Sequence, residues 1–291
     1  MFRTMLFSPG NNPKRMKKAL DLPADAIIFD LEDAVAVTEK ESARNIITEV
    51  LSQHQKLRKE IIVRINALDT PYAAGDLEAI VPNKPDGIML PKSETAEAIK
   101  GVAERISQLE KQSGMEAGTI ALFPLVETAV GVLNAREIAA ASDRIVCLSF
   151  GAIDFTTDIG VKLTAGGEEL FYARSHLVLA SRAARIGAPV DTVYPNIKDD
   201  QGLRQETELA AQLGMFGKLV IHPNQIPVVN QVFTPDEKEV AWAKKVNDAY
   251  EEAEKQGIGA IQVDGKFIDV PVANRAKKVL ALAAEIEKKT D

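Results

Sequence analysis

The chain has 291 residues, of which 46% are hydrophobic and 26% are charged, as in an ordinary soluble globular protein. Its 35 basic and 42 acidic side chains give a formal net charge of −7, which argues against nonspecific binding to nucleic acid. An anionic small molecule is still a compatible ligand, because it needs only local positive charge. The length suffices for one barrel of alternating strands and helices plus a small extension.

We expect no targeting segment, no membrane span and no disulfide. No basic segment followed by an apolar stretch precedes the first predicted strand, so a secretory signal is not expected. No uninterrupted apolar run approaches the roughly 18 residues of a membrane span. The one cysteine, Cys147, lies in an apolar run and is expected in the core. These features predict a cytoplasmic protein that is not attached to a membrane.

Eight short apolar runs, most of them separated by helix-like segments, each end at a polar or turn-forming residue. Buried parallel strands have such continuous apolar sequences. In a (β/α)8 TIM barrel, the catalytic residues follow the carboxyl ends of the strands. The sequence therefore predicts an α/β fold of this type, with strands at Met5–Ser8, Ala26–Phe29, Ile61–Val63, Gly87–Leu90, Ile120–Val126, Ile145–Phe150, Val190–Val193 and Leu219–Ile221.

Beyond the eighth run, the sequence predicts a helix, a β-hairpin and a second helix. Thr234 is the expected N-cap of the first helix, because a proline follows it and a glutamate lies three residues later. Asp264-Gly265, between two short strand-like segments, predicts a type I′ turn. We therefore divide the chain into a catalytic barrel, residues 1–234, and a C-terminal extension, residues 235–291.

Glu127 and Asp154 follow the fifth and sixth predicted strands. Neighbouring strands lie about 4.8 Å apart, so both carboxylates can reach one ion. Two carboxylates that leave several coordination positions open suit Mg²⁺. Zinc is less favoured, because no histidine or cysteine lies near them in sequence. The alternative is that one or both carboxylates are helix caps or form structural ion pairs.

A second polar group follows the second and third predicted strands. Asp30, Glu32 and Asp33 lie within four residues and repel one another unless a cation or hydrogen-bond donors compensate. We expect them around the ligands and waters of the metal, or alternatively in a polar loop with a helix cap. Arg64 ends the third strand, where a buried guanidinium needs an anionic partner. That partner is either a substrate carboxylate, bound through two hydrogen bonds, or one of these acids.

The three histidines are scattered along the sequence. His54 lies on a polar predicted helix and is expected to be solvated. His176 lies on an amphipathic predicted helix and is expected to be structural. Only His222 directly follows a predicted strand, so it is the one histidine that we place among the candidate site residues.

In these strand-end segments the chain resembles the citrate lyase β-subunit-like lyases, within the larger group of HpcH/HpaI aldolases and malyl-CoA lyases. The matching stretches occur in order along nearly the whole chain, and together they are specific although each alone is modest. They are Met5–Asn11, Phe29–Val35, Val63–Asn66, Leu90–Lys92, Glu127–Ala129, Gly151–Phe155, Gly217–Pro223 and Phe267–Pro271.

The resemblance implies a Mg²⁺-dependent lyase that cleaves or forms a carbon–carbon bond in a 3-hydroxyacyl thioester, with acetyl-CoA and a 2-oxoacid as products. It implies that Glu127 and Asp154 bind the metal and that Arg64 binds the substrate. It also implies that Asp269 is a catalytic carboxylate delivered from a neighbouring subunit, and hence a homotrimer or hexamer. The alternative is that Asp269 only caps the final helix.

Three activities are possible within this resemblance. The strand ends at residues 191–196 and 221–223 look like those of stand-alone CoA-thioester lyases. For such an enzyme, our hypothesis is that Lys14, Arg15 and His222 bind coenzyme A. Residues 169–174 also occur in the true citrate lyase β-subunit, which would act on a thioester of an acyl carrier protein. A malyl-CoA thioesterase, which hydrolyses the thioester, is the third possibility.

Overall fold

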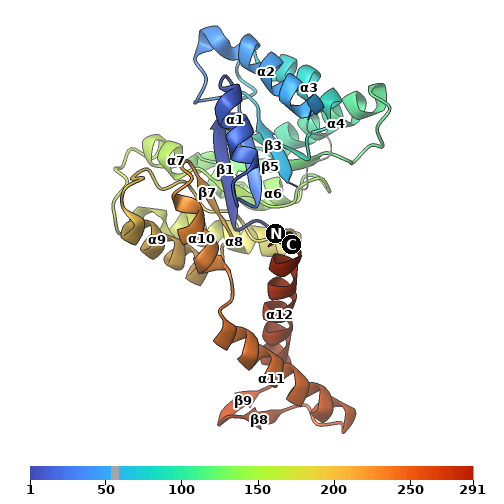
Figure 1. Ribbon diagram of the computed structural model, residues 1–291, viewed down its shortest axis with the longest axis vertical. Helices are drawn as coiled ribbons and strands as arrows, with labels where there is room; N and C mark the ends of the chain where they lie inside the picture. The colour runs from blue at the N-terminus through green and yellow to red at the C-terminus, as the bar shows by residue number, and fades with distance from the viewer. Residues whose placement is uncertain (54–58, 291) are drawn as a thin grey trace. The chain divides into compact units, whose positions relative to one another are not determined.

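A computed structural model of the protein describes residues 1–53 and 59–290. The chain separates into two compact units, Met1–Asn230 and Gln231–Asp291. In the first unit, β1, β3, β5 and β7 lie in the middle and the helices lie around them (Figure 1). His54 lies outside the described residues.

A seven-stranded sheet forms the centre of the first unit, in the order β6-β5-β4-β3-β2-β1-β7. All of its pairings are parallel, so the carboxyl ends of the strands lie at one edge. The predicted α/β fold with a parallel sheet is confirmed. The strands are β1 Thr4–Pro9, β2 Ala26–Asp30, β3 Glu60–Arg64, β4 Gly87–Leu90, β5 Ala121–Val126, β6 Ser149–Phe150 and β7 Lys218–Val220.

The predicted strand Val190–Val193 is not a regular strand. Val190 and Asp191 form isolated parallel bridges, to Ser149 of β6 and to Lys218 of β7, respectively. Residues 192–194 have no regular secondary structure, so the pairing of this run ends at Asp191. The predicted extent of this strand is therefore wrong, although its two paired residues lie next to both edge strands.

Apolar side chains of the strands and of the segments beside them pack into one buried cluster. Successive residues of a strand point to opposite faces, so alternate residues enter this cluster. Cys147 belongs to it and is 3% exposed, which confirms its predicted place in the core. The buried cluster consists of Met5, Ala26, Ile28, Ile62, Met89, Phe123, Leu125, Cys147, Val190 and Leu219.

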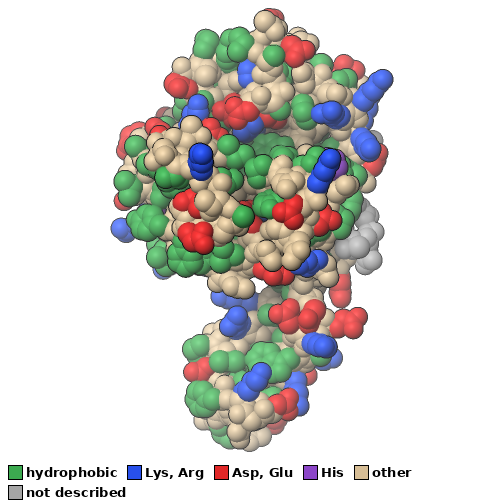
Figure 2. Space-filling view, turned by 90° about the vertical axis from the view of Figure 1, so that its left-hand side faces the viewer, with side chains coloured by type: hydrophobic (Ala, Val, Ile, Leu, Met, Phe, Trp, Pro, Cys, Tyr) green, Lys and Arg blue, Asp and Glu red, His purple; other side chains and the backbone are tan. Residues whose placement is uncertain are grey.

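Helices connect the strands. No helix among the described residues is long and apolar enough to cross a membrane. Acidic and basic side chains are interspersed over the face seen in Figure 2. The helices up to the end of the sheet-bearing region are α1 Pro13–Leu20, α2 Lys40–Gln53, α3 Ala73–Ile80, α4 Ala96–Gln112, α5 Ala129–Leu133, α6 Ala135–Ala139, α7 Ala152–Asp158, α8 Phe171–Ala184, α9 Asp200–Leu213 and α10 Gln225–Phe233.

The second unit contains two long helices and a hairpin. In the hairpin, Asp264 and Gly265 both have positive φ, 49° and 76°, as a type I′ turn requires. The predicted N-cap Thr234 is wrong. Asp236 caps the first helix instead, because its carboxylate accepts the N–H of Glu239 at 2.7 Å while Glu239 bonds back to the N–H of Asp236. The elements are α11 Glu237–Lys255, β8 Ile261–Val263, β9 Lys266–Ile268 and α12 Val270–Thr290.

Candidate active site

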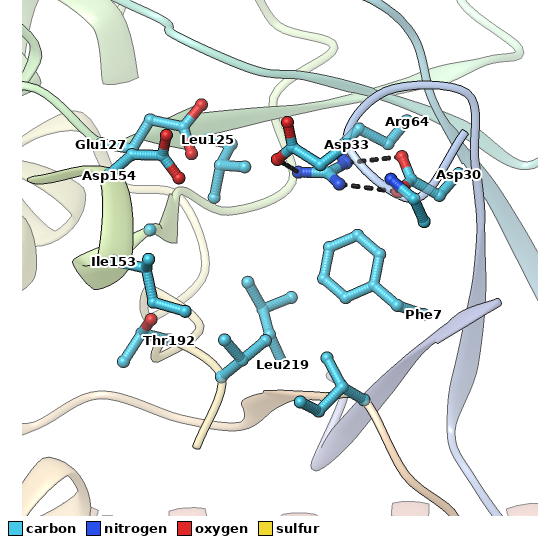
Figure 3. Close-up of a pocket in the computed structure, with 14 residues that line it drawn as sticks. Phe7, Asp30, Asp33, Arg64, Leu125, Glu127, Ile153, Asp154, Thr192 and Leu219 are labelled. Atoms are coloured by element: carbon cyan, nitrogen blue, oxygen red, sulfur yellow. Dashed lines mark hydrogen bonds and ion pairs between the residues drawn. The ribbon is translucent and has the colours of Figure 1, made fainter. Parts of the chain in front are cut away.

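A cavity of about 330 Å³ lies at the carboxyl ends of the strands in the first unit. Its apolar lining includes Phe7 at the end of β1 and Leu219 of β7. Figure 3 shows Glu127 and Asp154 beside each other, and Arg64 between Asp33 and Asp30. The structure therefore brings five of the predicted site residues to one cavity: Asp30, Asp33, Arg64, Glu127 and Asp154.

Arg64 is held by the acidic segment that follows β2. Its Nε and Nη2 donate to the two oxygens of Asp30, both at 2.7 Å. Its Nη1 lies 2.8 Å from Glu32 and 3.3 Å from Asp33. The guanidinium also lies over the ring of Phe7, 4.8 Å from the ring centre. In the described structure Arg64 is thus paired with the acids that the sequence analysis named as its alternative partners.

This pairing sets the charge state of both partners. Burial by itself raises the pKa of Asp30, but the charge and hydrogen bonds of Arg64 outweigh it and leave the pKa below its usual value. Burial likewise lowers the pKa of Arg64, but Asp30 and then the other acids more than reverse this. Asp30 is therefore ionised and fixes the orientation of the guanidinium.

Glu32 differs from Asp30. Burial raises its pKa to about 7, with repulsion from Asp33 and Asp30 adding to the effect and attraction from Arg64 opposing it. Mutual repulsion is the effect that the sequence predicts for these three acids, and Arg64 relieves it only in part.

The acidic segment is fixed by Lys40, which the sequence analysis did not single out. Lys40 is 7% exposed, and its Nζ donates to the backbone carbonyls of Leu31 and Glu32 at 2.7 and 2.6 Å. Burial lowers its pKa. The only sequence signal was a lysine at the start of a helix, where acidic residues are favoured by the helix dipole.

Glu127 lies at the other side of the cavity and is 3% exposed. One of its oxygens accepts the backbone N–H of Lys92 at 2.7 Å. The other lies against Gly151, where an added Cβ would approach it to 2.5 Å. Burial raises the pKa of Glu127 to about 8, and Glu32 and Asp154 add to the effect, while the Lys92 N–H and Arg64 oppose it.

Asp154 lies in the first turn of α7 and is exposed. Together with Glu127 it gives the cavity two hard oxygen donors and room for further ligands, which is the environment that Mg²⁺ prefers. The described residues contain no cluster of three or more His, Cys, Asp or Glu side chains arranged as a metal site. A dication would also offset the repulsion that raises the pKa of Glu127, so the residues present fit Mg²⁺.

The raised pKa of Glu127 predicts a pH dependence of Mg²⁺ binding. In the metal-free protein Glu127 is protonated below about pH 8, and the proton must leave before the carboxylate can bind a metal. We expect the affinity for Mg²⁺ to rise about tenfold per pH unit below this pKa and to level off above it. Calorimetric titrations with Mg²⁺ on both sides of the pKa measure this slope, and an affinity independent of pH would contradict the prediction.

The residues that we assigned to coenzyme A fall partly together. Arg15 and His222 line a second cavity of about 300 Å³, with Lys18 as a further basic residue. This cavity shares Phe7 and Ile221 with the first one. Lys14 is exposed and is not among the lining residues.

The remaining predicted residues lie elsewhere. Asp269 is in the second unit, where its carboxylate accepts the N–H of Val272 at 3.3 Å at the start of α12. This contact is the helix cap that the sequence analysis considered, and a catalytic role of Asp269 stays a prediction. His176 is stacked on Tyr172 in α8, with the rings 5.5 Å apart.

Comparisons with known proteins place these features in a family context. Residues 3–223 match the family model described as HpcH/HpaI aldolase/citrate lyase. The chain is 45% identical to citrate lyase subunit beta of Leuconostoc mesenteroides subsp. cremoris, over 97% of this chain and 93% of that protein. It is 34% identical to the mitochondrial citramalyl-CoA lyase of Rattus norvegicus, over 99% of this chain and 87% of that protein.

A solved structure gives a similar result. Protein CitE from Mycobacterium tuberculosis, in complex with magnesium, acetoacetate and coenzyme A, superposes with a TM-score of 0.77 and 33% sequence identity. The similarity covers 97% of this chain and 97% of that chain. It therefore includes both compact units of the present protein.

Proposed function

Since this chain belongs to the HpcH/HpaI aldolase/citrate lyase family, we propose that it is a Mg²⁺-dependent carbon–carbon lyase. Its substrate is a 3-hydroxyacyl-CoA of the citryl, malyl or citramalyl type, and its products are acetyl-CoA and a 2-oxoacid. The observation that carries this proposal is the single cavity in which Glu127 and Asp154 lie beside each other and Arg64 is fixed by Asp30.

The chemistry of the reaction assigns a task to each residue. Glu127 and Asp154 would hold the ion, which when bound supplies Lewis acidity at the hydroxyl oxygen that becomes the ketone of the 2-oxoacid. Arg64 binds an anionic part of the substrate with its Nη1 group, which lies 2.8 Å from Glu32 and 3.3 Å from the exposed Asp33. Because Asp30 holds the other two nitrogens, the guanidinium stays in place when the substrate replaces Asp33.

Coenzyme A binding belongs to the second cavity. Arg15 and His222 line it, and its shared residues connect it to the first cavity. The basic Arg15 and Lys18 side chains suit the phosphate groups of coenzyme A, whereas Lys14 would contact the cofactor only from outside this cavity.

The fold proposal follows the same family. We propose that the bridges at Val190 and Asp191 close the sheet into a (β/α)8 barrel, since they join the two edge strands β6 and β7. Residues 1–234 would form the catalytic domain in the cytoplasm. Residues 235–291 would contribute to a homotrimer or hexamer.

The proposal is tested by product analysis. The purified protein is incubated with Mg²⁺ and, in turn, with citryl-, malyl- and citramalyl-CoA. We expect acetyl-CoA and one 2-oxoacid from the preferred ester, and no products in excess chelator. Release of free coenzyme A and the hydroxyacid without a 2-oxoacid would instead indicate a thioesterase.

A second candidate function is favoured by the 45% identity to a citrate lyase subunit beta. In that case the thioester would be carried by an acyl carrier protein rather than by coenzyme A. The two substrates are compared directly, as citryl-CoA and as citryl thioester of the carrier. A much higher kcat/KM with the carrier would assign the protein to a multi-subunit lyase.

The proposed role of Asp269 predicts complementation between two inactive variants. Asp269→Asn and Glu127→Gln chains are mixed under conditions that allow subunit exchange. If Asp269 completes the site of a neighbouring subunit, some mixed interfaces contain both intact residues, and part of the activity returns. No recovery despite demonstrated exchange would mean that each chain completes its own site or that Asp269 only caps α12.

A further inference from the structure

We propose that Thr192 is a positioning residue for the metal site, because its hydroxyl holds the start of the helix that carries Asp154. This inference rests on the proposed function and adds a residue to its site. Thr192 is 1% exposed and lines the same cavity as Glu127 and Asp154. Figure 3 shows it next to Ile153, on the side of the cavity that holds both carboxylates.

The start of α7 has no cap of its own. Its N-cap position is Gly151, which has no side chain to accept a backbone N–H. Helices usually begin with Ser, Thr, Asp or Asn for this purpose. None of these four residues fits at position 151, because a Cβ there would lie 2.5 Å from one carboxylate oxygen of Glu127 and 2.7 Å from the Cβ of Glu127. Because Gly151 lies so close to Glu127, the helix that carries Asp154 has no side chain at its N-cap position.

Thr192, from another part of the chain, supplies an acceptor for one of the N–H groups that have no partner within the helix. Its Oγ1 accepts the N–H of Ala152, the first residue of α7, at 2.9 Å. Asp154 lies two residues further on, within the same first turn. An unpaired buried N–H at this position would cost free energy, so the hydroxyl fixes where the helix begins.

Thr192 is itself fixed by a buried ion-pair network. The preceding residue, Asp191, is fully buried and accepts from Nε of Arg174 at 2.8 Å and from Nζ of Lys218 at 2.7 Å. Its backbone carbonyl also accepts the N–H of Leu219 at 2.8 Å. The hydroxyl of Thr192 therefore has a defined position relative to the sheet that carries Glu127. Glu127 lies against Gly151 at the N-cap of α7, and Asp154 lies in the first turn of the same helix. By fixing the start of α7, the hydroxyl of Thr192 therefore sets the position of Asp154 relative to Glu127.

The test compares substitutions that do or do not keep the hydroxyl. Thr192→Val keeps the size of the side chain and removes the acceptor, whereas Thr192→Ser keeps the acceptor. Thr207→Val is the matched control, because Thr207 is equally buried and its hydroxyl bonds to Leu203 in α9, on a different helix. Mg²⁺ dissociation constants are measured by calorimetry, and amide exchange at Ala152 is measured in the metal-free proteins.

For Thr192→Val we expect about tenfold weaker Mg²⁺ binding, as when a group that orients a metal ligand is lost. We also expect faster exchange of the Ala152 amide. Thr192→Ser and Thr207→Val should bind Mg²⁺ as the parent protein does. If Thr192→Val does not fold, Thr192→Ala is compared with Thr192→Ser in the same assays.

Unchanged Mg²⁺ affinity in a folded Thr192→Val protein would overturn the inference. A higher KM for the thioester with unchanged Mg²⁺ affinity would also overturn it, because Thr192 would then contact the substrate. Failure of the proposed function has a different signature, since the parent protein itself would bind no Mg²⁺ at Glu127 and Asp154. If the parent protein binds no Mg²⁺, the capping role of Thr192 is still tested by amide exchange, and slow exchange of the Ala152 amide in Thr192→Val would refute it.

Discussion

The Glu127→Gln variant is expected to bind Mg²⁺ at least about 10²-fold more weakly than the parent protein, since loss of a direct ligand costs more than loss of an orienting partner. Glutamine keeps the size of the side chain and an oxygen that accepts the Lys92 N–H. It removes one of the two carboxylate charges that face the ion. Lyase activity should fall with the metal affinity, and calorimetry together with a product assay measures both.

The stability of metal-free Glu127→Gln shows whether its weaker Mg²⁺ binding results from the lost ligand or from unfolding. The pKa of Glu127 is raised to about 8 from an unfolded-state value near 4.5, so folding favours its neutral form. Stability that depends on this proton is present at low pH and is lost as the pH rises towards 8. A neutral glutamine has no such dependence. Metal-free Glu127→Gln should therefore be at least as stable as the parent protein above pH 8.

Glu137→Gln is the matched control, because Glu137 is exposed on α6 and does not line the cavity. It should leave the Mg²⁺ affinity and the thermal stability unchanged. Full activity of Glu127→Gln, or full activity of the parent protein in excess chelator, would remove the basis for a metal site at Glu127.

The second large effect is expected for Arg64→Lys, with a loss of at least about 10²-fold in kcat/KM, in the range for one preorganised donor. The guanidinium makes two bonds to Asp30 and still presents Nη1 to Glu32 and Asp33. A lysine ammonium is a point charge on a flexible chain and cannot keep this planar arrangement. The charge is conserved, so the loss measures geometry.

Arg105→Lys serves as the control for this substitution. Arg105 is paired with Glu78 at the surface, at 2.7 Å and with both side chains partly exposed, and such pairs contribute little. Its kcat/KM should equal that of the parent protein. Circular dichroism shows whether Arg64→Lys is folded, and a folded variant with normal kcat/KM would make Arg64 a purely structural partner of Asp30.

The sequence by itself determined where most of the parallel strands lie along the chain and the strand-end position of most candidate site residues. Continuous apolar runs identify buried strands wherever a polar residue marks their end, and seven of the eight predicted runs contain strands of the sheet. Parallel strands end at one edge, so Arg64, Glu127 and Asp154 could be assigned to a common site before their distances were known.

Only the tertiary structure decided how these groups are held. Lys40 reaches back to the carbonyls of Leu31 and Glu32, and Thr192 accepts an N–H from residue 152. Both contacts join residues that are not neighbours in sequence, and neither has a local pattern. The pKa of Glu127 is likewise raised by burial and by the charge of Glu32, and both effects exist only in the folded chain. Sequence periodicity reports which face of an element is buried, whereas hydrogen bonds and charge interactions depend on distances that exist only after folding.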